Sequence, residues 1–226
     1  ATKVAKTKAG VDVTIEKQNG NSETLQGSHL LVCIGQVPNS DDLGLGKAGI
    51  ATDKAGYIQH DGKLQTNVPG VWVIGDVKGG PAFTHVSYDD FLVLSDNLLE
   101  GKNRNIDNRV VPYALYTDPE LGRVGLSERE ARAKGYRLKI GSYPMAHIAR
   151  AIERSETAGL MKIVINADND RILGATVLGP DGGELVQTLM ALMMADAAYT
   201  LFENDMFIHP TLTEGFFGLM ASIKPA

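Results

Sequence analysis

Two short stretches of the sequence place reactive side chains in defined positions, and the first ends at Asp76. A Val-Pro-Gly turn leads there into four apolar residues, which stop at Gly75 and Asp76. This pattern predicts a short buried strand over 71–74 with a carboxylate at its carboxyl end. Ligands of open α/β sheets lie beyond the carboxyl ends of the strands, so Asp76 would stand where a ligand binds. The alternative is a buried strand followed by an ordinary Asp turn.

The second stretch holds His209, Pro210 and Glu214 near the carboxyl end of the chain. Pro210 restricts the backbone beside His209 and suits the start of a helix, which would place Glu214 about one turn later. A carboxylate beside an imidazole raises its basicity and fixes its tautomer, as a general acid–base pair requires. The spacing therefore indicates a candidate catalytic pair. A histidine near a helix start can equally be structural.

Thr84 and His85 open a predicted helix over 84–100, shortly after Asp76 and a Gly-Gly-Pro turn. The free N–H groups and the positive dipole end of this helix could stabilise an electron-rich ring oxygen. The alternative is that Thr84 caps the helix and His85 points to solvent. Apolar residues at helical spacing form the predicted buried face: Phe91, Leu92, Leu94, Leu98 and Leu99.

The composition is that of an average soluble globular protein and narrows the classes of partner. The 226 residues suffice for one large or two ordinary domains, and the net charge of −5 gives no electrostatic reason to expect nucleic acid or an anionic membrane as partner. The single cysteine, Cys33, cannot form an internal disulfide, which fits a cytoplasmic protein. Its place in the apolar run 30–34 predicts a buried structural thiol. No Cys pair or His/Cys cluster has zinc spacing, so no metal site is predicted.

A nucleotide-loop pattern, G-x-G-x-x-G, occurs at 44–49. Its mechanism needs a strand before it and a helix after it, whose amino terminus receives the pyrophosphate. Asn-Ser-Asp-Asp precedes the pattern and Ile-Ala-Thr-Asp follows it, and neither predicts such an element. We interpret the pattern as a coincidence in a glycine-rich loop.

Turn signals and apolar alternation predict the order of the elements before residue 108. A hairpin over 11–25 turns at an Asn-Gly pair, and the non-alternating run 30–34 predicts a strand buried on both faces. Residues 41–65 are rich in loops, with a weak hairpin over 58–64. The polar stretch 102–108, which follows the helix, is typical of a linker.

Beyond residue 108 the pattern changes to paired strands with flanking helices. Ser127 and Glu130 form a capping box for a helix that ends near Lys134. The other predicted elements are strands over 110–116, 137–143, 160–166 and 171–179, and a helix over 181–197 followed by the segment 199–204. In the last helix Leu185, Leu189, Leu192 and Met193 form the apolar stripe, and Met190, Met193 and Met194 are interpreted as core or subunit-contact residues. The order predicts an α/β portion followed by an α+β domain.

Taken together, these stretches resemble the carboxyl-terminal half of the class I pyridine nucleotide-disulfide oxidoreductases, a family that includes dihydrolipoamide dehydrogenase, glutathione reductase and mercuric reductase. Residues 31–39 resemble the strand and Gly-Arg-x-Pro-Asn turn that close the nicotinamide domain, with Gln36 in place of the usual Arg. Residues 79–90 are similar to the branch of the reactive-chlorine-resistance flavoprotein. Residues 66–76 resemble the second flavin motif of the family. Residues 111–126 resemble the opening of its interface domain, and residues 209–214 resemble its catalytic dyad.

The resemblance implies FAD and NAD(P) as cofactors of the whole enzyme. Asp76 would bind the ribityl hydroxyls of FAD, and the helix start would line the pyrimidine edge of the flavin. The residues assigned to cofactor binding on this basis are Gly35, Gly75, Asp76, Phe83, Thr84 and His85.

For catalysis the resemblance implies a homodimer. His209, oriented by Glu214 and followed by a cis peptide bond to Pro210, would reach across a two-fold axis to the redox dithiol of the partner subunit. Phe207 stands where the family often has another histidine. The chain keeps His209 and ends without a cysteine pair, which makes true mercuric reduction less expected.

Apart from the pattern at 44–49, interpreted above as a coincidence, this sequence contains neither of the two G-x-G-x-x-G loops of the family's amino-terminal half, nor its C-x-x-x-x-C redox pair. We therefore expect a carboxyl-terminal fragment: the end of the NAD(P)-binding domain over 1–40, the second FAD-binding segment over 41–107 and a dimerisation domain over 108–226. The parent would use NAD(P)H and FAD to reduce a disulfide or metal-ion substrate through a dithiol. The alternative is that the chain alone is an inert dimerisation module.

Overall fold

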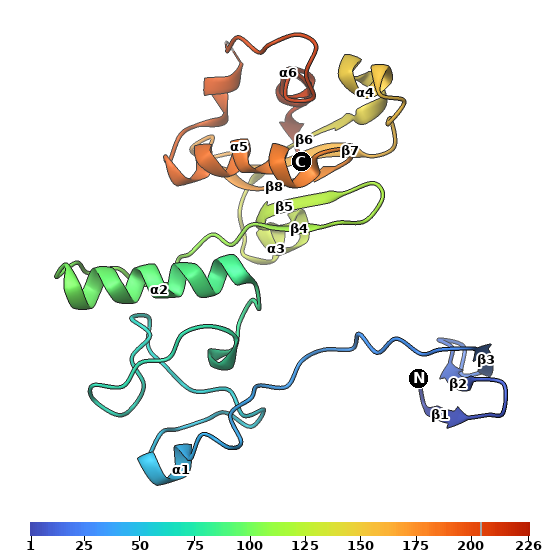
Figure 1. The fold of residues 1–226 in the computed structure, drawn as a ribbon. Helices are drawn as coiled ribbons and strands as arrows, with labels where there is room; N and C mark the ends of the chain where they lie inside the picture. The colour runs from blue at the N-terminus through green and yellow to red at the C-terminus, as the bar shows by residue number, and fades with distance from the viewer. Residues whose placement is uncertain (204) are drawn as a thin grey trace.

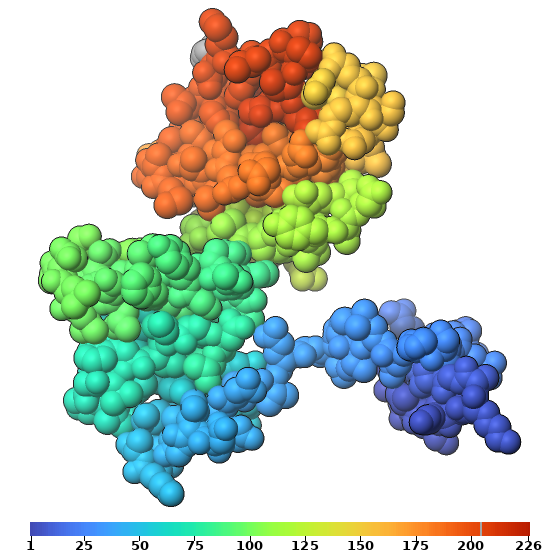
Figure 2. Space-filling model, viewed as in Figure 1, coloured from blue at the N-terminus to red at the C-terminus, as the bar shows by residue number. Residues whose placement is uncertain are grey.

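The computed structural model describes residues 1–203 and 205–226 and arranges them in three parts (Figure 1). The amino-terminal part is an antiparallel sheet of β1 (Lys3–Lys6), β2 (Val11–Glu16) and β3 (Ser22–Gly27), in that order. The predicted hairpin is confirmed, and β1 is too short to show alternation in the sequence. Figure 2 shows this sheet standing apart from the rest of the chain, to which an extended segment joins it.

The run 30–34 lies in that extended segment, so the prediction of a buried strand is wrong. Leu31 and Ile34 are 85% and 93% exposed, and Cys33, predicted to be buried, is exposed as well. A strand buried on both faces needs hydrogen-bonded neighbours and covering layers. Within the described part of the chain, no strand pairs with this run. Apolar composition records the preference of side chains for burial and cannot show whether a covering layer is present.

The middle part has few regular elements: α1 (Leu45–Ala48), the 3-10 turn η1 (Asp76–Lys78) and the long helix α2 (Thr84–Leu99). The strand predicted over 71–74 is not formed, because only Trp72 makes a β-bridge, to Gln65. Hydrogen bonds of this run reach one side only, where Val73 N donates to Leu64 O at 2.9 Å. The weak hairpin predicted over 58–64 is not formed: the bridge of Ile58 is to Thr52, outside that range, and 61–64 form a turn in which Leu64 N donates to Asp61 O at 3.0 Å.

Helix α2 has the predicted bounds but not the predicted buried face. Phe91, Leu98 and Leu99 are 49%, 50% and 78% exposed. The buried positions are Val86, Asp90 and Val93, which recur at i, i+4 and i+7. The helix therefore buries a face that includes a carboxylate, which an apolar pattern cannot predict. Its N-cap is Phe83, without a side-chain hydrogen bond, so Thr84 does not cap it.

The carboxyl-terminal part is an α+β domain built on a six-stranded sheet in the order β4-β5-β8-β7-β6-β9, antiparallel throughout. The strands are β4 (Tyr113–Leu115), β5 (Leu121–Gly125), β6 (Leu138–Pro144), β7 (Leu160–Asn166), β8 (Ile172–Leu178) and β9 (Lys224–Pro225). The helices are α3 (Glu128–Ala133), α4 (Ala149–Glu153), α5 (Gly182–Met194) and α6 (Gly215–Ala221), with 3-10 turns η2 (Met145–His147) and η3 (Tyr199–Phe202). Of the predicted segment 199–204, Asn204 lies outside the described residues.

The main core fills the space between this sheet and helices α5 and α6. Phe216, Leu219 and Leu189 are fully buried there, and the stripe of α5 contributes Leu185, Val186, Leu189 and Leu192. The capping box of α3 is present as predicted, with Ser127 and Glu130 each accepting from the other's backbone N–H. In the described ranges no helix combines the length and the apolar character needed to cross a bilayer.

Candidate functional site

Asp76 stands at the first position of η1, exposed, after a sharp turn at Gly75. Gly75 has φ 77° and ψ −167°, a conformation that side chains with a Cβ disfavour. Asp76 faces a hollow of about 280 Å³ whose lining also includes Tyr57 and residues 36–39. Gly35 immediately precedes that lining stretch and is itself exposed. The structure thus presents the Asp76 carboxylate as a free acceptor in a small cleft.

Behind Asp76 lies a buried charged cluster that the sequence did not predict. The carboxylate of Asp90, 0% exposed, accepts the N–H of Gly75 at 2.9 Å and lies 3.4 Å from Lys78 Nζ. Its other oxygen lies 2.8 Å from Arg109 Nη1, which also contacts Asp89 at 2.9 Å. Burial lowers the pKa of Arg109, but hydrogen bonds and attraction from both carboxylates outweigh this, so its pKa lies above the ordinary value.

The amino terminus of α2 carries an aromatic stack. Phe83 stacks on His85, with ring centroids 5.1 Å apart, and on Tyr113, at 5.8 Å. His85 Nε2 lies 2.8 Å from the carbonyl oxygen of Pro112, which makes it the donor of that bond. The ring is therefore tied to the segment entering β4, whereas the exposed Thr84 leaves its first-turn N–H without an acceptor inside the helix.

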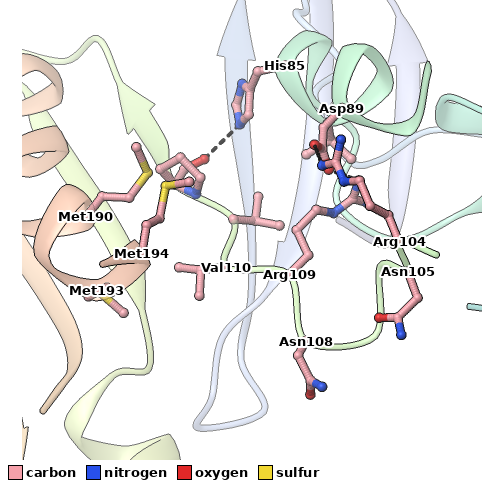
Figure 3. A pocket seen from close by; sticks show the side chains of 13 residues that line it. His85, Asp89, Arg104, Asn105, Asn108, Arg109, Val110, Met190, Met193 and Met194 are labelled. Atoms are coloured by element: carbon pink, nitrogen blue, oxygen red, sulfur yellow. Dashed lines mark hydrogen bonds and ion pairs between the residues drawn. The ribbon is translucent and has the colours of Figure 1, made fainter. Parts of the chain in front are cut away.

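Figure 3 shows the cavity of about 560 Å³ that this arrangement leaves between α2, the segment 104–112 and α5. One wall carries His85, Asp89 and the two arginines Arg104 and Arg109, and the other carries the thioethers of Met190, Met193 and Met194. Met190 and Met193 pack against the main core, as predicted. Met194 is 74% exposed, and its interpretation as a subunit-contact residue stays a prediction.

The structure brings His209 and Glu214 together. His209 Nδ1 lies 2.8 Å from Glu214 Oε2, and the bond between His209 and Pro210 is cis. The helix does not begin at Pro210 as predicted: α6 begins at Gly215, because 209–214 form an irregular turn in which Thr211 Oγ1 accepts the N–H of Glu214. The imidazole faces a hollow of about 340 Å³ whose lining includes His147 and Phe207.

Phe207, at the place of the family's additional histidine, is an apolar wall of this hollow. Its ring packs edge to face on Phe217, with centroids 4.8 Å apart, and on Phe202, at 5.4 Å. The cleft of Asp76 and the hollow of His209 share no lining residue. Asp76 and His209 therefore line separate hollows of one chain.

The glycine motif at 44–49 has a structural explanation. The motif at 44–49 encloses the single turn α1, with Gly44 and Gly49 in left-handed conformations at its two ends. No strand lies directly before the motif, over 28–43, and the helix after its first glycine has only four residues. Both observations agree with the interpretation of the motif as a coincidence. Across residues 1–203 and 205–226, no three side chains of His, Cys, Asp or Glu are grouped to hold a metal ion.

Comparison with known proteins decides the family. Residues 111–218 match the dimerisation domain of the pyridine nucleotide-disulphide oxidoreductases, and residues 1–90 match a second domain of the same family. The chain belongs to the pyridine nucleotide-disulphide oxidoreductases. The dimerisation-domain match contains β4 to β8 and α3 to α5, together with the His209 turn.

Relatives within the family include oxidoreductases of two kinds. The chain is 38% identical to a dihydrolipoyl dehydrogenase of Thermus scotoductus over 207 residues, 91% of this chain and 44% of the relative. It is 35% identical over 196 residues to the probable pyridine nucleotide-disulfide oxidoreductase RclA of Escherichia coli, covering 86% and 44%. A Cu(II) complex of the HOCl-induced flavoprotein disulfide reductase RclA superposes with a TM-score of 0.87 at 32% identity, covering 96% of this chain and 48% of that one. The chain thus spans about half the length of these relatives.

Proposed function

We propose that this chain supplies the second FAD-binding segment, the dimer interface and the acid–base pair of an NAD(P)H-dependent flavoprotein. The whole enzyme reduces a disulfide or metal-ion substrate through a redox-active dithiol. In this proposal residues 1–40 belong to the NAD(P)-binding domain, 41–107 to the FAD-binding domain and 108–226 to the dimerisation domain. The family matches and the relatives named above support the reaction class.

The observation that carries the proposal is the contact between His209 Nδ1 and Glu214 Oε2 at 2.8 Å. A carboxylate only accepts hydrogen bonds, so Nδ1 carries the proton and Nε2 keeps a lone pair. The side chain of His209 is 73% exposed, so Nε2 is open to a reactant. The ring can take a proton from a thiol at Nε2 and return it to a departing thiolate, while Glu214 holds the tautomer and balances the charge.

The residues at the other site fit a flavin. Asp76 offers an exposed carboxylate to hydroxyl groups, and the amino terminus of α2 offers free N–H groups beside the ring of Phe83. Bound FAD would supply the transfer of electrons from NAD(P)H to the disulfide. The protein residues hold it: Asp76 by accepting from the ribityl hydroxyls, and Thr84 and His85 by lining its pyrimidine edge.

A homodimer completes the acid–base site in this proposal. The sequence contains one cysteine, Cys33, so His209 must meet a dithiol contributed from elsewhere. Its imidazole lies on a surface with exposed apolar neighbours, among them Met206 at 92% and Ile208 at 78%. These side chains suit burial against a partner subunit. In the whole enzyme, the thiols that His209 serves would lie in a part of the partner's chain outside this sequence.

The test is steady-state turnover of a disulfide substrate by the flavoprotein that contains this chain. His209→Gln is expected to lower kcat by roughly 10²–10⁴-fold, the usual contribution of general acid–base catalysis. His60→Gln, at a half-buried histidine of the middle part, is the matched control and should leave kcat unchanged. Unchanged turnover in His209→Gln would remove the acid–base assignment.

The single cysteine favours a second reading of the chain taken by itself: a dimerisation module without catalysis. An absorbance spectrum separates the two. The module should be colourless, whereas a yellow preparation with the visible band of oxidised flavin would contradict it and show that this segment alone holds FAD.

A further inference from the structure

We propose that Asp90 is a positioning residue for the flavin, which acts by holding the turn that presents Asp76. This inference rests on the proposed function, since it assumes that Asp76 binds the ribityl hydroxyls. Asp90 lies in the second turn of α2, directly after Asp89. Because two aspartates stand side by side there, the sequence alone does not show which one is buried.

Asp90 contacts residues that precede and follow Asp76 in the sequence. One oxygen accepts the N–H of Gly75, the residue before Asp76, at 2.9 Å. The same oxygen lies 3.4 Å from the ammonium group of Lys78, two residues after Asp76. Lys78 Nζ also donates to the carbonyl oxygen of Gly79 at 3.2 Å. Asp90 therefore fixes the entry and the end of η1, and Asp76 is the exposed residue between them.

We call the contacts of Asp90 with Gly75 and Lys78 the clamp. The second oxygen of Asp90 connects the clamp to another segment of the chain. It lies 2.8 Å from Arg109 Nη1, on the segment that leads from α2 to β4. A guanidinium cannot be deprotonated in a protein and makes directed hydrogen bonds, so it holds the carboxylate in one rotamer. The orientation of Asp90, and through it that of the Gly75 turn, is set from a third segment of the chain.

The burial of this cluster points to geometry rather than stability as its role. Asp90 is 0% exposed, the side chain of Lys78 is 3% exposed and that of Arg109 is 14% exposed. Removing charges from water costs about as much as their pairing returns, and apolar residues of the same size often serve stability equally well. Val86 and Val93 flank Asp90 on the buried face, and a further aliphatic residue there would extend that face. An aliphatic side chain could not hold the N–H of Gly75.

The experiment is a double-mutant cycle on FAD affinity, measured by fluorescence on the flavoprotein that contains this chain. Asp90→Asn is expected to weaken FAD binding by roughly 10-fold or more, because it replaces charge-assisted hydrogen bonds with neutral ones. In an Asp76→Asn background the same change should cost less than about 3-fold, because the carboxylate that the clamp presents is already gone. Asp96→Asn is the matched control: Asp96 lies on the same helix and pairs with Lys102 and Arg104 but with neither Arg109 nor the Gly75 turn, so FAD affinity should stay within about 2-fold.

The outcomes separate the inference from the proposed function. An equal effect of Asp90→Asn with and without Asp76 would overturn the positioning role and leave the flavin assignment in place. If Asp76→Asn itself did not change FAD affinity, the flavin assignment would fall, and the inference with it. Should Asp90→Asn fail to fold, Lys78→Met removes the ammonium group that Asp90 contacts and keeps an unbranched apolar side chain. The same double-mutant cycle with Asp76→Asn then tests whether the clamp acts through Asp76.

Discussion

His209 and Glu214 form a hydrogen-bonded pair whose two members differ sharply in exposure. The distance from Nδ1 to Oε2 is 2.8 Å, and the side chains are 73% and 16% exposed respectively. Glu214 is the fixed member, since Thr211 Oγ1 accepts its N–H at 3.2 Å and in turn donates to Ile208 O at 2.7 Å. The imidazole is held at one edge and open at the other.

This asymmetry predicts the tautomer of His209. In the chain as it stands, the Nδ1–H form should dominate at neutral pH, because Glu214 accepts that proton. Glu214→Ala should shift the ring toward the Nε2–H form that free imidazole side chains prefer. Nitrogen-15 NMR of histidine-labelled protein distinguishes the forms. Glu153→Ala, which removes an exposed carboxylate paired with Arg150, is the control and should not change the His209 signals. A wild-type Nε2–H form would contradict the prediction.

Two adjacent phenylalanines of α6 should differ widely in their effect on stability. Phe216 is 0% exposed and stacks on Phe202, with centroids 5.9 Å apart, whereas Phe217 is 41% exposed. Phe216→Ala is expected to lower the free energy of unfolding by about 3–5 kcal/mol through lost contacts and a cavity. Phe217→Ala should cost about 1 kcal/mol. Denaturant unfolding of the chain measures both, and similar losses in the two variants would show that the packing of α6 differs from that described.

The capping box of α3 predicts a pH-dependent contribution to stability. Hydrogen bonds from the hydroxyl and the backbone N–H of Ser127 hold the pKa of Glu130 below its ordinary value of 4.5. A carboxyl group whose pKa is lower in the folded state stabilises the fold above the ordinary value, and this contribution is lost as pH falls through the folded-state pKa. The Tm of the wild-type chain should therefore exceed that of Glu130→Gln at pH 7, with the difference disappearing toward pH 3.

The same comparison in a Ser127→Ala background provides the control. The hydroxyl donor to Glu130 is then absent, so the pH-dependent difference in Tm should shrink. Ser127→Ala alone should cost about 1 kcal/mol at low pH through loss of the acceptor of the Glu130 N–H, and more at pH 7, where the hydroxyl also donates to the charged carboxylate. A difference that is constant from pH 7 to pH 3 would show that the Glu130 carboxylate does not contribute through its charge.

The features that the sequence predicted correctly are those written in a few neighbouring residues. The Asn-Gly turn between β2 and β3, the Ser127–Glu130 cap and the bounds of α2 all depend on local conformation. The pairing of His209 with Glu214 is also local, at a separation of five residues. Such signals need no knowledge of the rest of the fold.

The errors occur where distant segments decide the structure. The runs 30–34 and 71–74 have the composition of strands, but a strand forms only when neighbours satisfy its N–H and C=O groups. The burial of Asp90 depends on Lys78, 12 residues before it, and on Arg109, 19 residues after it. An aspartate on an apolar helix face could have drawn attention to the cluster, but its partners could not be identified from spacing.

Finally, the apolar surface around the His209 turn predicts a dimer contact. Within the family's dimerisation domain, exposed apolar side chains lie beside His209: Met206 at 92% and Ile208 at 78% precede it in the chain, and Phe217 at 41% lines the same hollow. Burying a carboxylate in place of Ile208 leaves a charge without a partner, so Ile208→Asp should weaken dimerisation by about 2 kcal/mol or more, roughly 30-fold in Kd. Leu99→Asp, equally exposed at 78% on α2, is the matched control and should remain dimeric. Sedimentation velocity across a concentration series measures both, and a wild-type chain that stays monomeric throughout would refute the contact.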